Sequence, residues 1–241
     1  MHGMFIHVLN TLLYIIENQS VMTIEPVAYF HSPLCHKFGI PRQSGLVSGL
    51  KGEITFVKEW QKAEAIRGLD GFDYLWLIWG FSAHEHAVKS PTVRPPLLGG
   101  NRRMGVFATR SPFRPNNLGL SCVKLDFIEW ETPNGPVLHV LGGDLMDGTP
   151  VYDIKPYLPS VEAHGDARGG FTDEAHWQRL HVEVPEEMKE GLSESQLQTL
   201  INLLELDPRP QYIDDADRIY GLMFDGRNIH FRVDGDKVYL V

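Results

Sequence analysis

The segment of the chain with the most unusual chemistry is residues 108–121 (ATRSPFRPNNLGLS), where two arginines lie close together. Arg110 and Arg114 flank a Ser-Pro-Phe sequence, and the prolines and asparagines disfavour both a helix and a strand. A planar guanidinium in such a stiff loop can bind a carboxylate or a phosphate through two parallel hydrogen bonds. The segment therefore predicts an anion-binding loop, and an ordinary solvated basic loop is the alternative interpretation.

A second candidate lies in residues 144–159 (DLMDGTPVYDIKPYLP), which begin with two acidic residues and a turn. The sequence DGTP at 147–150 has the composition of a tight turn. Asp153 and Lys155 follow on an extended stretch two positions apart, so that their side chains share a face. This pair is either a plain ion pair or a holder of the hydroxyl or amino groups of a ligand.

Two further segments carry weaker signals. Residues 39–45 (GIPRQSG) form a loop in which Gln43 could hydrogen-bond a base or an amide. His84 and His86 bracket Glu85, and on a strand the two imidazoles would share a face. Since no third ligand is placed near them, the sequence does not predict a metal site.

The elements that must position these segments are mainly strands. Residues 72–81 (FDYLWLIWGF) are a continuous apolar run, which favours a strand buried on both faces, and residues 58–66 have the composition of a short helix. Further alternating or β-rich runs occur at 23–31, 52–57, 104–109, 121–130 and 137–142. Strand after strand with tight turns predicts a mainly β core, as an antiparallel barrel or a folded sheet.

The composition changes after residue 159. Residues 160–172 hold many small, charged and glycine residues and are expected to form a linker or a surface excursion. Ser193 with Gln196 three positions later predicts a capped helix, whose apolar stripe is Leu197, Leu200, Ile201 and Leu204. Residues 219–224 and 228–233 predict a hairpin around Asp-Gly. We expect a smaller α+β appendage at 165–241.

Length and charge agree with this division. The chain has 241 residues and a net charge of −9, but residues 36–124 hold 13 lysines and arginines against six acidic residues, a local charge of +7. The basic region could face a polyanion. The apolar run at residues 4–16 is too short to span a membrane. We expect residues 1–22 to be either an extension added before the natural start or an extra N-terminal helix. Cys35 and Cys122 lack CxxC spacing and are expected to be buried thiols in a reducing compartment.

Three segments resemble the TsaA-like (TrmO) family. They are residues 38–43 (FGIPRQ), 91–114 (PTVRPPLLGGNRRMGVFATRSPFR) and 147–159 (DGTPVYDIKPYLP), within a match over roughly residues 24–164. The predicted C-terminal helix and the sequence DPRP at 207–210 resemble the appended domain of the family. The resemblance implies a core domain at 23–164 followed by the C-terminal domain at 165–241.

The resemblance implies a small β-barrel that binds S-adenosylmethionine. It also implies a homodimer that acts in the cytoplasm and binds neither a membrane nor a metal. The implied reaction is methylation of N6 in N6-threonylcarbamoyladenosine at position 37 of tRNA, so the partner is the anticodon stem-loop. By the family pattern the cofactor site contains Pro41, Arg42, Gln43, Arg110, Leu120, Asp147, Gly148, Thr149 and Pro150. The resemblance also places Ser82 and Ala83 in the cofactor site, at positions where the family often has a His and a polar partner, so they depart from the family pattern.

The roles that remain are a proton acceptor and a surface for RNA. Asp147 or Asp153 could accept the N6 proton directly or through water. The basic residues that could contact tRNA phosphates are Lys89, Arg94, Arg102, Arg103 and Arg114. The alternatives are a non-catalytic barrel that binds S-adenosylmethionine or RNA, and a hydrolase or lyase that uses the two aspartates with the histidine pair.

Overall fold

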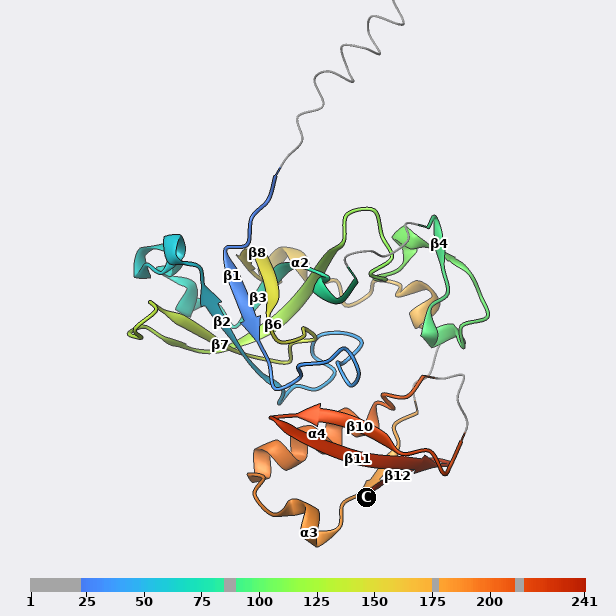
Figure 1. Cartoon of the computed structure of the whole chain (residues 1–241). Coiled ribbons are helices and arrows are strands. Elements are labelled where there is room, and N and C mark those ends of the chain that lie inside the picture. The colour runs from blue at the N-terminus through green and yellow to red at the C-terminus, as the bar shows by residue number, and fades with distance from the viewer. Residues whose placement is uncertain (1–22, 85–89, 175–177, 211–214) are drawn as a thin grey trace, which may run out of the picture.

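The computed structural model of the chain describes residues 23–84, 90–174, 178–210 and 215–241. A core of strands lies on one side and a smaller part with a sheet and helices on the other, and the connection after the first strand runs between them (Figure 1). The prediction of a mainly β fold with a smaller α+β part is confirmed. The segment at 1–22, which was expected to be an extension or a helix, lies outside the described residues.

The core consists of six antiparallel strands whose hydrogen-bonded order is β1-β2-β7-β6-β3-β8. The strands are β1 (Ala28–His31), β2 (Lys51–Phe56), β3 (Tyr74–Gly80), β6 (Leu118–Glu129), β7 (Val137–Leu141) and β8 (Thr149–Pro156). β8 also pairs with β1, with Ala28 opposite Val151, so the order returns to its first strand. Side chains that point to the inside of this sheet therefore share one enclosed interior.

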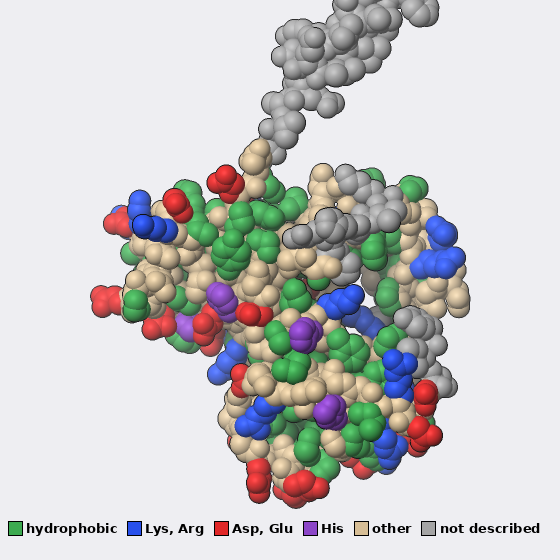
Figure 2. Space-filling view, in the orientation of Figure 1, with side chains coloured by type: hydrophobic (Ala, Val, Ile, Leu, Met, Phe, Trp, Pro, Cys, Tyr) green, Lys and Arg blue, Asp and Glu red, His purple; other side chains and the backbone are tan. Residues whose placement is uncertain are grey.

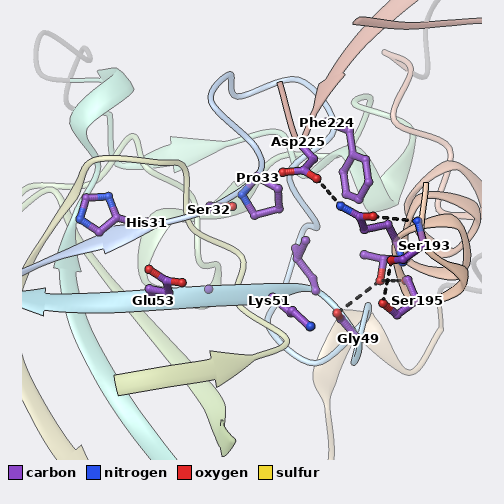
Figure 3. A pocket seen from close by; sticks show the side chains of 14 residues that line it. His31, Ser32, Pro33, Gly49, Lys51, Glu53, Ser193, Ser195, Phe224 and Asp225 are labelled. Carbon is purple, nitrogen blue, oxygen red and sulfur yellow. Dashed lines mark hydrogen bonds between the residues drawn. The ribbon is translucent and has the colours of Figure 1, made fainter. Parts of the chain in front are cut away.

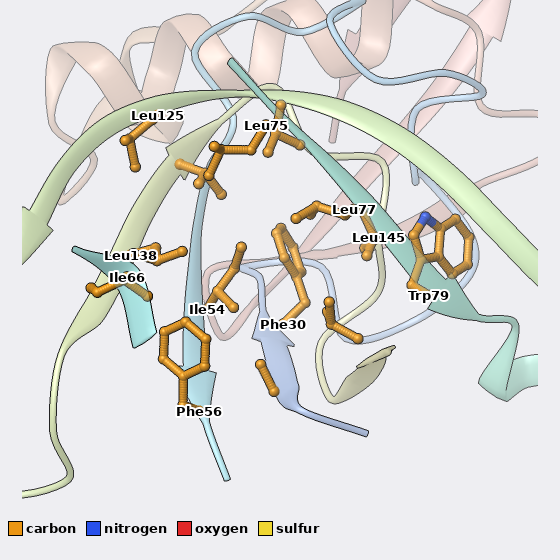
Figure 4. Packing of buried hydrophobic residues seen from close by; sticks show 14 residues of the cluster. Phe30, Ile54, Phe56, Ile66, Leu75, Leu77, Trp79, Leu125, Leu138 and Leu145 are labelled. Carbon is orange, nitrogen blue, oxygen red and sulfur yellow. The ribbon is translucent and has the colours of Figure 1, made fainter. Parts of the chain in front are cut away.

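Alternate residues of the strands fill that interior. Phe30, Ile54 and Leu77 are completely or almost completely buried, and Figure 4 shows them pointing toward one another between the strands. β3 was expected to be buried on both faces, and this is wrong: every second residue is buried, but Tyr74 is 44% exposed. An antiparallel sheet needs only one covered face. The segment after the core covers part of the outer face of β3, where Trp76 donates a hydrogen bond to Glu162 Oε1 at 2.9 Å.

The connections between the core strands are short 3-10 helices and a small ribbon. The 3-10 helices are η1 (Lys58–Trp60), η2 (Ala63–Ile66), η3 (Leu69–Gly71), η4 (Ser82–His84), η5 (Pro96–Leu98) and η6 (Val106–Ala108), and β4 (Thr92–Val93) pairs with β5 (Met104–Gly105). The short helix expected at 58–66 is thus two separate turns. The strand expected at 104–109 ends after two residues, because the chain turns at Val106, whose carbonyl accepts from Thr109 N at 3.2 Å.

The C-terminal part is a four-stranded sheet with one long helix. Its sheet has the order β10-β11-β12-β9, and its elements are β9 (His181–Glu183), α3 (Glu186–Lys189), α4 (Glu194–Glu205), β10 (Tyr220–Phe224), β11 (Arg227–Asp234) and β12 (Lys237–Leu240). The predicted capping box is confirmed, since Ser193 and Gln196 bond each other reciprocally. The predicted hairpin is also confirmed. Of the four residues expected to form the apolar face of α4, Leu200 and Leu204 are buried. Leu203 is also buried, whereas Leu197 and Ile201 are only partly buried.

A second hydrophobic cluster joins the two parts. Leu34 and Leu50, from the connection between β1 and β2, are buried together with Leu200 and Leu203 of α4. In the same connection Gly39 has φ +89°, and a Cβ there would lie 2.1 Å from Leu222 Cδ1, so only glycine fits. The loop that carries residues 41–43 is therefore held from both sides.

The segment after the core is exposed. α2 (Pro159–Glu162) and η7 (Gly170–Thr172) are its only helical turns among the described residues, and most of residues 158–174 face solvent, as a linker would. Cys35 is exposed and Cys122 is half-buried, so the expectation of two buried thiols is wrong for Cys35, which lies in a surface loop. No helix within the described ranges is long and apolar enough to cross a membrane.

Candidate functional site

Two of the segments singled out by sequence meet at a direct contact. Arg110 Nη1 donates a hydrogen bond to Gln43 Oε1 at 2.5 Å, although 67 positions separate the two residues. The neighbouring Arg42 points elsewhere, and its Nη2 donates to the backbone carbonyl of Asp207 at 3.3 Å. In the loop at 37–44, Gln43 therefore contacts Arg110 in the segment at 108–121, while the preceding Arg42 contacts the C-terminal part.

A largely buried carboxyl group, that of Asp144, lies beside this contact. Ser121 Oγ donates to Asp144 Oδ1 at 2.5 Å and accepts a hydrogen bond from Trp79 Nε1 at 2.9 Å. Burial raises the pKa of Asp144 above its ordinary value, while the hydrogen bond from Ser121 and the nearby charge of Arg110 act in the opposite direction. Arg110 is exposed, so it lies at the surface near an acidic group in the interior.

Sequence reasoning did not select Asp144 or Ser121 as site residues. The available signal was an aspartate directly after an apolar strand and two glycines, a position where a carboxylate needs a partner if it is buried. The loop that approaches them is fixed to the core, since Ser44 Oγ accepts from Cys122 N at 3.2 Å and Gly45 N donates to Gly142 O at 2.8 Å.

The turn at 147–150 is anchored to the end of β1. Asp147 Oδ1 accepts a hydrogen bond from Ser32 N at 3.2 Å and lies 3.3 Å from His31 Nδ1. His31 Nε2 lies 2.8 Å from Thr55 Oγ1, so the imidazole bridges Asp147 and β2. Thr149 is buried, and its hydroxyl donates to Met146 O within the turn at 2.7 Å. The hydroxyl of Thr149 is therefore used by the turn itself, whereas Asp147 is exposed.

Asp153 and Leu120 lie on either side of one residue of β3. Ile78 pairs with Leu120 of β6 and with Asp153 of β8, and Leu120 is 48% exposed. The expectation that Asp153 and Lys155 share a face is confirmed, because Lys155 Nζ lies 2.7 Å from Asp153 Oδ2. The pair is partly exposed and is an ion pair in the structure.

The corner formed by Ser82 and Ala83 follows directly after β3 in η4 (Ser82–His84). Ser82 is half-buried and Ala83 is exposed. Of the predicted histidine pair, His86 lies outside the described residues, as does Glu85. In the part of the chain that the structure describes, no three His, Cys, Asp or Glu side chains gather as metal ligands.

Two clefts of about 520 Å³ each lie between the core and the C-terminal part. The first cleft lies between β1, the start of β2 and the beginning of α4 (Figure 3), and none of the predicted cofactor residues lines it. Two contacts within its lining join the core and the C-terminal part or link β10 to α4: Gln196 bonds Asp225, and Thr199 bonds Gly49 O.

The second cleft brings together residues from three of the singled-out segments. Pro41 and Arg42 line it with Arg94 of the core and with residues 207–210 of the C-terminal part. The full lining is Lys37, Phe38, Gly39, Ile40, Pro41, Arg42, Arg94, Pro96, Gly99, Gly100, Leu203, Leu206, Asp207, Pro208, Arg209 and Pro210. The DPRP sequence, for which the chemistry of the residues gave no role, is thus part of a basic cleft.

The remaining basic residues are held individually. Arg103 Nη1 donates to Thr92 Oγ1 at 2.8 Å, and Arg114 Nη1 donates to Thr109 O at 3.0 Å. Arg102 lies 3.6 Å from Glu174 in an exposed ion pair. Lys89, also predicted to contact RNA, lies outside the described residues. Of the four members of this group that the structure describes, Arg94 lines the second cleft.

Comparisons with known proteins agree over both parts. Two family models match the chain: the tRNA-methyltransferase O N-terminal domain over residues 29–163, and the TrmO C-terminal domain over residues 177–241. A tRNA (adenine(37)-N6)-methyltransferase of Escherichia coli (strain K12) is 39% identical over 223 residues, which cover 89% of this chain and 94% of that protein. One from Eikenella corrodens is 46% identical, covering 68% of this chain and 92% of that protein. A crystal structure of TrmO from Pseudomonas aeruginosa matches with a TM-score of 0.72 at 29% identity, over 91% of this chain and 96% of that one.

These likenesses extend from the β core through the C-terminal sheet. They define the class of the protein as a two-part, mainly β relative of tRNA methyltransferases, whose six-stranded core is antiparallel and not doubly wound. The chain belongs to the tRNA-methyltransferase O (TrmO) family. The membership that the sequence motifs predicted is confirmed.

Proposed function

We propose that this protein is an S-adenosylmethionine-dependent tRNA methyltransferase that methylates N6 of N6-threonylcarbamoyladenosine at position 37. The observation that carries the proposal is the contact of Gln43 with Arg110 beside the buried Asp144, in a chain of the TrmO family. This contact joins two segments that carry the family motifs. It creates a place with an amide, a guanidinium and a carboxylate at the edge of the core.

These groups fit the cofactor. The methionine end of S-adenosylmethionine carries a carboxylate and an ammonium group, which suit Arg110 and Asp144 respectively. We propose that Pro41, Arg42, Gln43 and Arg110 form one side of the site. The other proposed cofactor residues are Ser82, Ala83, Leu120, Asp147, Gly148, Thr149 and Pro150. The six-stranded core would then act as a cofactor-binding barrel.

The bound cofactor supplies an electrophilic methyl group on a sulfonium. The protein must hold the N6 nitrogen in line with that group and accept its proton. We assign proton acceptance to Asp147, because its carboxylate is exposed on the proposed cofactor turn and His31 can take the proton onward. Asp153 is the second candidate, but its carboxylate is already paired with Lys155.

The tRNA substrate requires a cationic surface, which residues 36–124 provide with their local charge of +7. We propose that the anticodon stem-loop contacts Lys89, Arg94, Arg102, Arg103 and Arg114. We further propose that the protein acts in the cytoplasm as a homodimer. The exposed Phe107 and Phe113 in and beside the arginine loop support a partner surface there.

The test is mass spectrometry of tRNA nucleosides from cells with and without the gene for this protein. The proposal predicts that the N6-methylated form of N6-threonylcarbamoyladenosine disappears with the gene, while its unmethylated precursor increases. A non-catalytic binding protein would leave the ratio of the two nucleosides unchanged, and that result would overturn the proposal.

A further inference from the structure

The second cleft lies directly beside the proposed cofactor site. Arg42 lines the cleft, and its neighbour Gln43 bonds Arg110 at the cofactor site. Adjacent Cα atoms are only about 3.8 Å apart, so the loop that lines the cleft with Arg42 contacts Arg110 through its next residue. Figure 2 shows lysine and arginine side chains at the hollow between the two parts of the molecule.

The cleft has a strong excess of positive charge. Four cations are among its described lining residues, Lys37, Arg42, Arg94 and Arg209, against the single carboxylate of Asp207. Cations that surround a partly enclosed space are screened less by solvent than the same groups on an open surface. The charge therefore predicts an anionic ligand.

Two of the guanidiniums are oriented by the same residue. Arg209 Nε and Nη2 donate to the two carboxylate oxygens of Asp207 at 2.8 and 3.0 Å, while Arg42 Nη2 donates to the Asp207 carbonyl at 3.3 Å. The side chain of Arg209 is only 12% exposed. Burial lowers the pKa of Arg42, which the charge of Asp207 opposes. Asp207 of the C-terminal part thus orients two guanidiniums, that of Arg209 in the same segment and that of Arg42 in the core loop.

The walls of the cleft distinguish between possible anions. Beside the cations, the lining is largely apolar, with Phe38, Ile40, Pro96, Leu203 and Leu206. A backbone phosphate is compact and strongly hydrated, and exposed lysines and arginines suffice to bind it. Apolar walls with guanidiniums suit a carboxylate attached to a carbon-rich group, since aliphatic surface is buried while the charge is paired.

We propose that the second cleft binds the carboxylate-bearing threonyl group of the modified adenosine, and that the C-terminal part thereby selects the modified base. This inference rests on the proposed function. The threonylcarbamoyl group is attached to the same N6 that receives the methyl group, so its carboxylate must lie close to the transfer site. Arg94 and Arg209 hold the carboxylate, and Asp207 positions Arg209.

The test compares the binding of two anticodon stem-loops that differ only in carrying adenosine or N6-threonylcarbamoyladenosine at position 37. Affinities are measured by fluorescence anisotropy with S-adenosylhomocysteine present, so that no transfer occurs. The wild-type protein is expected to prefer the modified stem-loop. Arg94→Gln is expected to reduce that preference about tenfold, as the loss of one charge-assisted hydrogen bond does.

Arg209→Gln is expected to reduce the preference similarly. The melting temperature of this variant is measured as well, because the side chain of Arg209 is only 12% exposed. Arg94 is exposed, so its variant keeps the test independent of folding. Arg67→Gln removes an exposed arginine that does not line the cleft and is the matched control, with the preference expected to stay at the wild-type value.

Three results would overturn the assignment. A wild-type protein without preference, or an Arg94→Gln variant that keeps the full preference, would show that the carboxylate does not bind in the cleft. An equal loss for both stem-loops, with a slope of log affinity against log salt that is lower by about one, would identify a backbone phosphate as the ligand. If the wild-type protein methylates the modified stem-loop in a separate assay, any of these results refutes the cleft assignment alone. Absence of transfer refutes the proposed function instead.

Discussion

The most informative single substitution is Arg110→Ala, because Arg110 connects the cofactor loop with the buried carboxyl group. In the structure it makes a hydrogen bond to Gln43 at 2.5 Å, and its charge opposes the rise that burial causes in the pKa of Asp144. If Arg110 binds the cofactor carboxylate, its removal eliminates one charge-assisted hydrogen bond, worth about 1.5–3 kcal/mol. The affinity for S-adenosylmethionine should therefore fall about 10- to 150-fold.

Isothermal titration calorimetry with S-adenosylmethionine measures this effect directly. The exposed position of Arg110 means that the variant should keep its melting temperature, so weaker binding cannot be attributed to unfolding. Arg110→Lys keeps the charge without the planar fork and should recover only part of the affinity. An unchanged affinity in folded Arg110→Ala would refute the assignment of Arg110 to the cofactor.

Three further predictions concern the aspartates and the basic surface. Because burial raises the pKa of Asp144, the folded state binds its proton more tightly than the unfolded chain, and the stability associated with that proton is lost as pH rises through the raised pKa. The neutral variant Asp144→Asn should therefore gain in melting temperature relative to wild type as pH rises, and a difference independent of pH would contradict the ionisation of a buried carboxyl. Asp147→Asn should reduce kcat about 10²- to 10⁴-fold if it accepts the proton, with a smaller effect for Asp153→Asn, as single-turnover kinetics will show; equal effects would remove the distinction between them. The double change of Arg102 and Arg103 to Ala should flatten the slope of log tRNA affinity against log salt by up to about two and leave cofactor affinity nearly unchanged, and a wild-type slope would show that these arginines do not contact phosphates.

Local patterns predicted the features that depend on neighbours in the chain. The capping box of Ser193 and Gln196 and the shared face of Asp153 and Lys155 are set by residues two or three positions apart, and both are confirmed. β3 was predicted as a strand, but its outer face was wrongly expected to be buried. Apolar composition does not distinguish a strand covered on both faces from one whose aromatic side chains, such as Tyr74, remain partly exposed.

The site depends on contacts that no local pattern contains. Gln43 and Arg110 meet only because the loop after β1 is pinned between the core and α4. Asp144 was not selected, since its hydrogen-bond partner Ser121 lies in β6, 23 positions away in the sequence. The role of residues 207–210 as a wall of the second cleft likewise follows from the packing of the C-terminal part against the core.

The central claim is that this chain transfers a methyl group to the modified adenosine. The most direct test incubates the purified protein with S-adenosylmethionine that carries an isotopically labelled methyl group and with an anticodon stem-loop containing N6-threonylcarbamoyladenosine at position 37. The account predicts that the label appears in that nucleoside, on N6, and that Arg110→Ala slows its appearance. A labelled cofactor that binds without any transfer to the nucleoside would contradict the account.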